Sequence, residues 1–375
     1  MTIPLKKITR PKIELMSTSS ILENPRPWAF NRSELTAGLR RHTGDPSLRI
    51  MELEELDLPD LRPALGRIRG LVVNCRGITG DYQFQLVLKE TRQTGTTRAG
   101  TASPGQREAG FYRDLADQVP VRIPRLYALD PMGNWLVLER LEAGKQPENW
   151  SRADYLLATA QLAILHDRFW NLGRDLGIYS WLERPLEADF EVNVKVATNA
   201  IDRLAGQSKS HLFGLRPDLE PLLRRMARHA DLIASALQRA PATLLHGDYW
   251  PGNIHVDAQG RLTVFDWQQV GIGPAVLDLV AFIQSSRWWF DPLPVDPLTI
   301  ILEYRRNLSE KTGTIWANRE WEALLANARM WIFLVNWVDI LASTPAPILE
   351  TRMQSLEEIW IAPLLDGVNR YLPED

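Results

Sequence analysis

Short segments in the first part of the chain alternate apolar and polar residues, which is the pattern of half-buried β-strands. Residues 48–53 and 82–88 alternate in this way, and residues 68–75 are mostly apolar. Turn-forming residues separate the three segments. The pattern therefore predicts a small antiparallel sheet.

From about residue 151 onward, apolar residues recur at the spacing of one helix face. One predicted helix shows this through Tyr155, Ala158, Leu162, Leu165 and Phe169. Residues 192–239 and 276–282 continue the helical pattern, and residues 330–341 are apolar on nearly every side. A small sheet followed by a larger set of helices predicts an α+β fold.

Composition narrows the class of protein. The chain has 375 residues with a net charge of -3, so it can bury a large core but lacks the basic surface expected for nucleic-acid binding. Cys75 is the single cysteine, which excludes an internal disulfide, and the six histidines lack zinc-binding spacing. The sequence indicates no apolar run of membrane-spanning length and no signal-peptide core. We therefore expect a cytoplasmic protein with neither nucleic acid nor membrane as a partner.

The most informative motif is H-x-D-x-x-x-x-N, formed by His246, Asp248 and Asn253, with Asp266 following at the end of an apolar β-type run. Phosphoryl transfer needs a carboxylate that orients the attacking hydroxyl and oxygen ligands for Mg²⁺. Asp248 suits the first role, and Asn253 and Asp266 suit the second. The alternative is a hairpin whose polar residues only satisfy turns. Gly247 completes the fuller pattern H-G-D-x-x-x-x-N, and a chance match to it in a chain of this length has a likelihood on the order of one in a thousand, which favours the functional interpretation.

At these residues the chain resembles the aminoglycoside phosphotransferase and choline kinase-like small-molecule kinases, which share the two-lobed protein-kinase-like fold. The resemblance covers residues 48–341. It implies that Asp248 is the catalytic base or the carboxylate that orients the hydroxyl, that Asn253 and Asp266 bind Mg²⁺, and that the cofactors are ATP and Mg²⁺. Trp267 and Gln268 replace the Phe-Gly that follows this aspartate in protein kinases, and no Ala-Pro-Glu element follows. We therefore expect a site without a switchable activation segment.

We expect three regions in the chain. They are an N-terminal extension at 1–46, a nucleotide-binding N-lobe at 47–141 and a C-lobe at 142–375. The extension contains one short helical pattern, at 33–41, with Asn31 or Ser33 as its N-cap.

Lys89 ends a β-type run and resembles the nucleotide-binding lysine of the family. Such a lysine contacts the α- and β-phosphates when a carboxylate holds it, and Glu108 is the best candidate partner. Glu90 is a competing partner, and a solvated lysine at a strand end is the alternative interpretation.

Two further nucleotide contacts are expected from position. Gly66 and Gly70 lie between the first two predicted strands, where glycines let backbone amides approach phosphates, although an ordinary turn fits equally well. Glu139 to Leu141 matches the segment whose backbone binds adenine in the family. A plain strand at the sheet edge is the alternative there.

Other polar residues suggest support and acceptor binding. His246 and Asp278 are expected to brace the loop, because a carboxylate in an apolar run needs hydrogen-bond donors. An acceptor site could use Asn336 and Asp339, at i and i+3, with Trp288 or Trp289 as its wall. Core packing is the favoured interpretation of that late helix, by roughly three to one.

The function expected from these residues is an ATP-dependent O-phosphotransferase. Its acceptor would be a small hydroxylated molecule, such as an aminoglycoside, a choline-like alcohol, a sugar or another natural product. The alternative is a catalytically silent kinase-like protein that binds nucleotide or ligand. A protein kinase is disfavoured by the missing activation-segment motifs.

Overall fold

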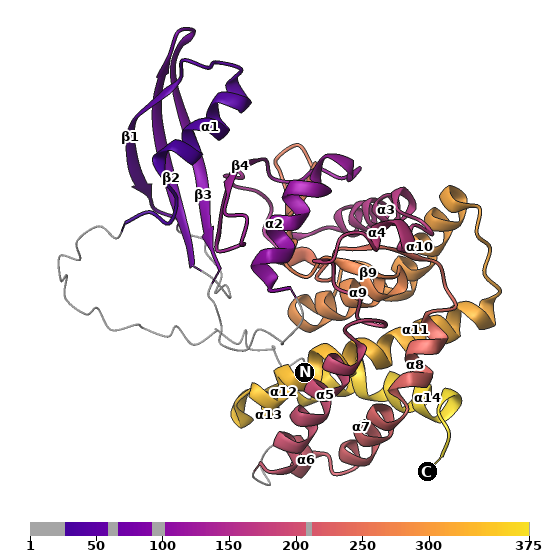
Figure 1. Cartoon of the computed structure of the whole chain (residues 1–375). Helices are drawn as coiled ribbons and strands as arrows, with labels where there is room; N and C mark the ends of the chain where they lie inside the picture. Colours follow the sequence, from indigo (N-terminus) through magenta and orange to yellow (C-terminus); the bar gives the residue numbers. More distant parts are fainter. Residues whose placement is uncertain (1–26, 59–66, 92–101, 208–211, 375) are drawn as a thin grey trace, which may run out of the picture.

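The computed structural model describes residues 27–58, 67–91, 102–207 and 212–374. It has the expected α+β fold, with a sheet-bearing N-lobe and a larger helical C-lobe (Figure 1). Two separate clusters of buried hydrophobic side chains form the cores. One lies between the sheet and the first helix, and the other runs through the C-lobe.

The N-lobe sheet has five antiparallel strands in the order β1-β2-β3-β5-β4. They are β1 Arg49–Leu56, β2 Arg67–Gly77, β3 Gly80–Glu90, β4 Leu126–Leu129 and β5 Trp135–Glu139. Helix α1, Arg32–Thr43, begins after the N-cap Asn31 and buries Leu35 and Leu39 in the same core as the sheet.

The alternative interpretation of Gly70 as part of an ordinary turn is wrong. Strand β2 begins at Arg67, so Gly70 lies inside the strand, opposite Leu56 of β1. A Cβ atom there would come within 2.4 Å of the Leu56 carbonyl oxygen, so the glycine allows close strand packing. Gly66 lies outside the described residues.

Helix α2, Pro104–Asp114, lies between β3 and β4 in the sequence and packs its Phe111 into the core of the C-lobe. Ser103 caps it by accepting a hydrogen bond from the Gln106 backbone N–H, and Pro104 suits the first helical position. The helix buries Glu108 and Phe111 against the rest of the protein.

The C-lobe is built from helices that pack around two short β-hairpin-like pairs. The helices are α3 Arg152–Arg168, α4 Gly173–Leu176, α5 Phe190–Ala205, α6 Leu212–Leu215, α7 Leu219–Arg228, α8 Ala230–Leu237, α9 Val276–Phe290, α10 Pro297–Thr312, α11 Asn318–Ile332, α12 Val338–Ser343, α13 Ala346–Leu356 and α14 Ala362–Tyr371. Single-turn 3₁₀ helices occur at Ala116–Gln118, Pro147–Asn149 and Pro251–Asn253. Phe333–Trp337 and Glu357–Ile361 are π-helical turns that continue α11 into α12 and α13 into α14.

The expectation of no apolar segment long enough to cross a membrane is wrong. Helix α11, the π-turn and α12 join into one helix, Asn318–Ser343, whose mean hydropathy reaches 1.3. However, 67% of its apolar window is buried inside the fold. The segment therefore has the character of a core helix, whose apolar faces are covered by other helices.

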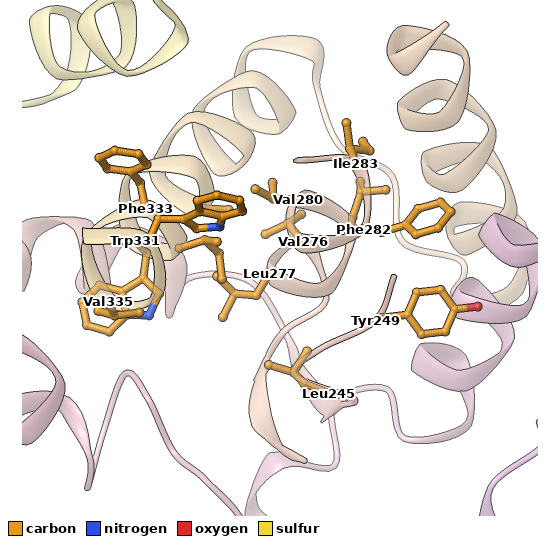
Figure 2. Close-up of a cluster of buried hydrophobic side chains, with 14 of the residues drawn as sticks. Leu245, Tyr249, Val276, Leu277, Val280, Phe282, Ile283, Trp331, Phe333 and Val335 are labelled. Carbon is orange, nitrogen blue, oxygen red and sulfur yellow. The ribbon is translucent and has the colours of Figure 1, made fainter. Parts of the chain in front are cut away.

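Two small strand pairs position the central motif. Strand β6, Ala242–Leu245, pairs with β9, Gly271–Pro274, and β7, Ile254–Val256, pairs with β8, Leu262–Val264. Residues 246–253, which we call the motif loop, connect β6 to β7, and Asp266 follows β8. The core beneath the motif loop is formed by α9 and α11, and Figure 2 shows Phe282 of α9 beside Tyr249 of the loop.

Candidate active site

Asp278, in the first turn of α9, holds the motif loop through its carboxylate. One oxygen accepts a hydrogen bond from the His246 backbone N–H at 2.7 Å, and the other accepts from the Gly247 N–H at 2.9 Å. The Nε2 of His166 on α3 lies 3.2 Å from the first oxygen. The Asp278 side chain is almost fully buried, so these donors supply the hydrogen bonds that water cannot.

His246 joins two chain segments as a neutral imidazole. Its Nδ1 accepts a hydrogen bond from the Asp248 backbone N–H at 3.2 Å, and its Nε2 lies 3.0 Å from the carbonyl oxygen of Phe265, to which it donates. Burial lowers the pKa of His246 more than the nearby Asp278 charge raises it. The ring therefore ties the motif loop to the segment that carries Asp266.

Only glycine fits at position 247. Its φ angle is +81°, a left-handed conformation that glycine adopts without strain. A Cβ atom would also come within 2.0 Å of the carbonyl oxygen of Gln269. The motif loop therefore packs directly on the segment after Asp266.

Asp248 lies in the motif loop with its carboxylate hydrogen-bonded. The Asn253 side-chain amide donates to Asp248 Oδ2 at 2.8 Å and to its backbone oxygen at 2.9 Å. Burial raises the pKa of Asp248 to about 6, and the Asp266 charge adds to this, whereas hydrogen bonds from Asn253 and from the Trp250 side chain oppose it. A carboxyl with this pKa is ionised at neutral pH and can still accept a proton.

Lys89, at the end of β3, forms ion pairs with carboxylates from both lobes. Its Nζ lies 2.6 Å from Glu108 Oε2 on α2 and 2.5 Å from Asp266 Oδ1. Burial opposes the charge on Lys89, but the two carboxylates outweigh it and raise the pKa. The competing Glu90 lies 3.9 Å from Arg67 instead.

The residue after Asp266 fixes the site by stacking. Trp267 is fully buried and stacks on Phe111 of α2, with ring centroids 4.0 Å apart and planes 7° apart. The ring centroid of Trp267 also lies 4.6 Å from that of His246. Asp266 itself has a φ of +67°, which is uncommon for a residue other than glycine. Tight packing of Trp267 therefore holds Asp266 in a strained conformation.

The residues present fit a Mg²⁺ ion that takes most of its ligands from phosphates and water. In the described residues, no group of three or more His, Cys, Asp or Glu side chains could hold a metal. Because Asn253 uses its amide nitrogen toward Asp248, its Oδ1 is the atom suited to a cation. Asn253 and Asp266 thus offer an amide oxygen and a carboxylate, the donors that Mg²⁺ prefers.

The expected adenine-binding segment leaves the sheet beside β3. Glu139 ends β5 opposite Leu86, and its backbone N–H donates to the Arg125 oxygen at 2.8 Å. Arg140 N–H donates to the Gln85 oxygen at 3.3 Å, and Leu141 follows directly.

Asn336 and Asp339 do not share one environment. Asn336 lines a small cavity of about 50 Å³ together with Gly247 and Gln269. Asp339 is half-exposed and lies 2.6 Å from Arg203 in an ion pair. The π-helical turn that contains Asn336 adds a residue to the turn, so the i, i+3 relation of an α-helix no longer applies.

The two tryptophans considered as an acceptor wall have opposite surroundings. Trp288 is buried, with its ring centroid 5.1 Å from that of Trp337. Trp289 is 55% exposed, and its ring lies 6.3 Å from that of Trp250 in the motif loop. Trp250 was not singled out from the sequence, although its position two residues after Asp248 was the available signal.

Comparison with known proteins identifies the family. The model of the phosphotransferase enzyme family matches residues 75–321. None of the curated proteins matches the chain.

Solved structures resemble this chain at low sequence identity. An ethanolamine kinase from Plasmodium vivax has a TM-score of 0.55 and 12% identity, over 83% of each chain. An aminoglycoside phosphotransferase from Alicyclobacillus acidocaldarius has a TM-score of 0.49 and 12% identity, over 87% of this chain and 93% of that one. A choline kinase from Streptococcus pneumoniae has a TM-score of 0.47 and 13% identity, over 85% and 92%. The expected resemblance is thus confirmed, and the chain belongs to the phosphotransferase enzyme family.

Proposed function

We propose that this protein is an ATP- and Mg²⁺-dependent O-phosphotransferase that phosphorylates a hydroxyl group of a small molecule. The observation that carries the proposal is the position of Lys89, whose Nζ lies within 2.6 Å of both Glu108 and Asp266. This contact joins the N-lobe strand to the segment that carries a proposed metal ligand. The Asn253–Asp248 hydrogen bond provides the second half of the site.

Each side chain has a defined task in this proposal. Lys89 binds the nucleotide phosphates while Glu108 holds it in place. Asp248 accepts a hydrogen bond from the acceptor hydroxyl, orients it toward the terminal phosphate and takes its proton. Asn253 and Asp266 would hold Mg²⁺, which supplies neutralisation of the phosphate charge when bound.

The nucleotide would enter between the two lobes. In the proposal the N-lobe spans 47–141 and the C-lobe 142–375, and the backbone of Glu139 to Leu141 binds adenine. Gly66 and Gly70 remain predicted contacts on the phosphate side. We also propose that the protein acts in the cytoplasm, on a free small molecule.

The family and the site together support a small hydroxylated molecule as the acceptor. Structural neighbours are described as kinases of ethanolamine and choline and as aminoglycoside phosphotransferases. These names are consistent with a hydroxylated small molecule as the acceptor, and the sequence match supports phosphoryl transfer.

An assay of ATP consumption with a panel of hydroxylated metabolites and antibiotics tests the proposal. We expect Mg²⁺-dependent turnover, with a product heavier by one phosphoryl group in mass spectra. Asp248→Ala should lower kcat by about 10²- to 10⁴-fold and leave ATP binding largely intact. ATP binding without any phosphorylated product would instead support a catalytically silent protein.

A further inference from the structure

Helix α9 lies along the motif loop with one face. Phe282 lies four residues after Asp278, and Trp289 lies eleven residues after it. At 100° per residue, the three side chains are within about 40° of one another around the helix. Asp278 holds the loop backbone, the Phe282 ring lies 5.6 Å from that of Tyr249, and Trp289 lies beside Trp250. This face therefore follows the loop from its first residue to a point beyond Asp248.

Trp250 is held between this helix and the loop itself. Its ring stacks on Phe290 with centroids 6.0 Å apart and planes 20° apart. On the loop side, a Cβ atom at Gly252 would come within 2.3 Å of the Trp250 ring, so the glycine allows the ring to lie against the backbone. The Trp250 side chain also lies close enough to Asp248 to lower the pKa of its carboxyl. An aromatic ring is thus fixed directly beside the catalytic carboxylate.

Trp289 extends this aromatic surface into solvent. Of the tryptophans, all of which lie in the described part of the chain, it alone is classed as exposed, at 55%. Large exposed aromatic surface is unfavourable in water, and where it adjoins a reactive group it commonly marks a binding site. We call Trp250, Trp289 and Phe290 the aromatic platform.

The charges around the platform do not favour a polycation. The Arg352 guanidinium lies 5.5 Å from the ring centroid of Trp288, and Arg287 precedes the tryptophan pair. The exposed carboxylate of Asp291 follows Phe290. At this end of α9, one carboxylate and two guanidinium groups give no excess negative charge to attract amino groups. The carboxylate beside Trp250 is Asp248, which accepts the Asn253 hydrogen bond and, in the proposed function, binds the acceptor hydroxyl.

The other candidate acidic groups of the acceptor side are already paired. Asp339 forms its ion pair with Arg203, and Asp278 is satisfied by the loop backbone. Glu183, which lines the small cavity near Asn336, lies 3.1 Å from Arg107. Apart from Asp248, what these described residues offer an acceptor is aromatic surface and amide groups.

We propose that the aromatic platform binds the acceptor, and that this acceptor is an uncharged alcohol carrying a flat apolar ring. This rests on the proposed phosphotransferase function. The ring of the acceptor stacks on Trp289, and its hydroxyl reaches Asp248 beside Trp250. Stacking on a fixed aromatic side chain requires no charge on the ligand, which matches the balance of charges around the platform.

The test compares acceptors and variants in the full-length protein. The probes are 2-phenylethanol and 4-hydroxybenzyl alcohol as neutral aromatic alcohols, choline as a cationic alcohol and kanamycin as a polycation. We expect phosphorylation of the aromatic alcohols. Trp289→Ala should raise their KM about tenfold, which corresponds to about 1.4 kcal/mol, and Trp289→Phe should restore most of the affinity. The KM for ATP should not change.

A matched control is available on the neighbouring helix. Leu302 of α10 is 53% exposed, close to the value for Trp289, so Leu302→Ala removes an exposed apolar side chain from a different helix. This variant should keep the wild-type KM for both substrates. An equal rise in KM in both variants would contradict the proposal.

A direct binding measurement tests the aromatic platform independently of the proposed phosphotransferase function. Equilibrium dialysis with 2-phenylethanol should show binding that Trp289→Ala weakens about tenfold, whether or not turnover occurs. Turnover of choline or kanamycin with an unchanged KM in Trp289→Ala would leave the phosphotransferase function intact and overturn the platform. Absence of aromatic-alcohol binding to the wild type would also overturn it.

Discussion

Replacing Asp248 by Asn should make the protein more stable while it removes activity. Asn keeps the size of the side chain and can still accept the Asn253 hydrogen bond, but it carries no charge. In the folded protein the pKa of Asp248 is about 6, against 3.8 for an unperturbed carboxyl. Ionised Asp248 therefore costs the folded state up to about 3 kcal/mol, at 1.36 kcal/mol per pKa unit.

The gain in stability should depend on pH in a defined direction. The pKa of Asp248 is higher in the folded state than in the unfolded state. The loss of stability caused by its ionisation is therefore fully present above pH 6 and disappears below about pH 4. We expect Asp248→Asn to raise the free energy of unfolding by about 1 to 3 kcal/mol at pH 8, and by about half as much at pH 5. The kcat should fall by about 10²- to 10⁴-fold.

Urea denaturation at pH 5 and pH 8, followed by tryptophan fluorescence, measures this effect. Asp339→Asn is the control, because Asp339 is a half-exposed ion-pair partner whose removal should change stability by less than about 1 kcal/mol. A destabilised Asp248→Asn protein at pH 8, or an equal gain at both pH values, would refute the reasoning. Wild-type turnover in that variant would refute the catalytic role.

Three further substitutions test separate parts of the site. Lys89→Met leaves the buried Glu108 without its cation and should destabilise the protein by about 3 to 5 kcal/mol. Adding Glu108→Gln should restore the stability measured by urea denaturation but should not restore turnover. If the double variant did not recover stability, the Lys89–Glu108 pairing would be contradicted. Asp278→Ala removes the acceptor of two backbone N–H groups, so it should lower the free energy of unfolding by about 3 kcal/mol or more and should also reduce kcat. An unchanged unfolding midpoint would show that the motif loop does not need these hydrogen bonds. Gly247→Ala introduces a Cβ atom 2.0 Å from the Gln269 oxygen at a φ of +81°, so we expect a loss of at least about 2 kcal/mol. Gly260→Ala is its control in the same denaturation experiment, since it shares a positive φ of +77° but has open space around it, and equal losses would mean that packing on Gln269 does not matter.

The sequence predicted the parts of the fold that depend on local periodicity and short spacing. Alternation between residues 48 and 88 predicted the three antiparallel strands, and the family resemblance is confirmed by the match over 75–321. The motif residues could be identified because the chemistry of phosphoryl transfer restricts residue types over a few positions.

Other features depend on packing that a single sequence does not show. The π-helical turn at Phe333–Trp337 changes the helix phase, so spacing alone could not show that Asn336 and Asp339 diverge. Gly70 looked like part of a turn because glycine is common in turns, but close strand packing explains it. The contact between Trp250 and Trp289 joins residues 39 positions apart, so local pattern carried no sign of it.

The central claim is that Asp266 and Asn253 together hold a divalent ion against the phosphates of one nucleotide. The most direct test is calorimetric titration of ATP into the wild type and Asp266→Asn, with and without Mg²⁺. We predict that Mg²⁺ strengthens ATP binding to the wild type and that this dependence is lost in the variant. Equal Mg²⁺ dependence in the two proteins would contradict the account.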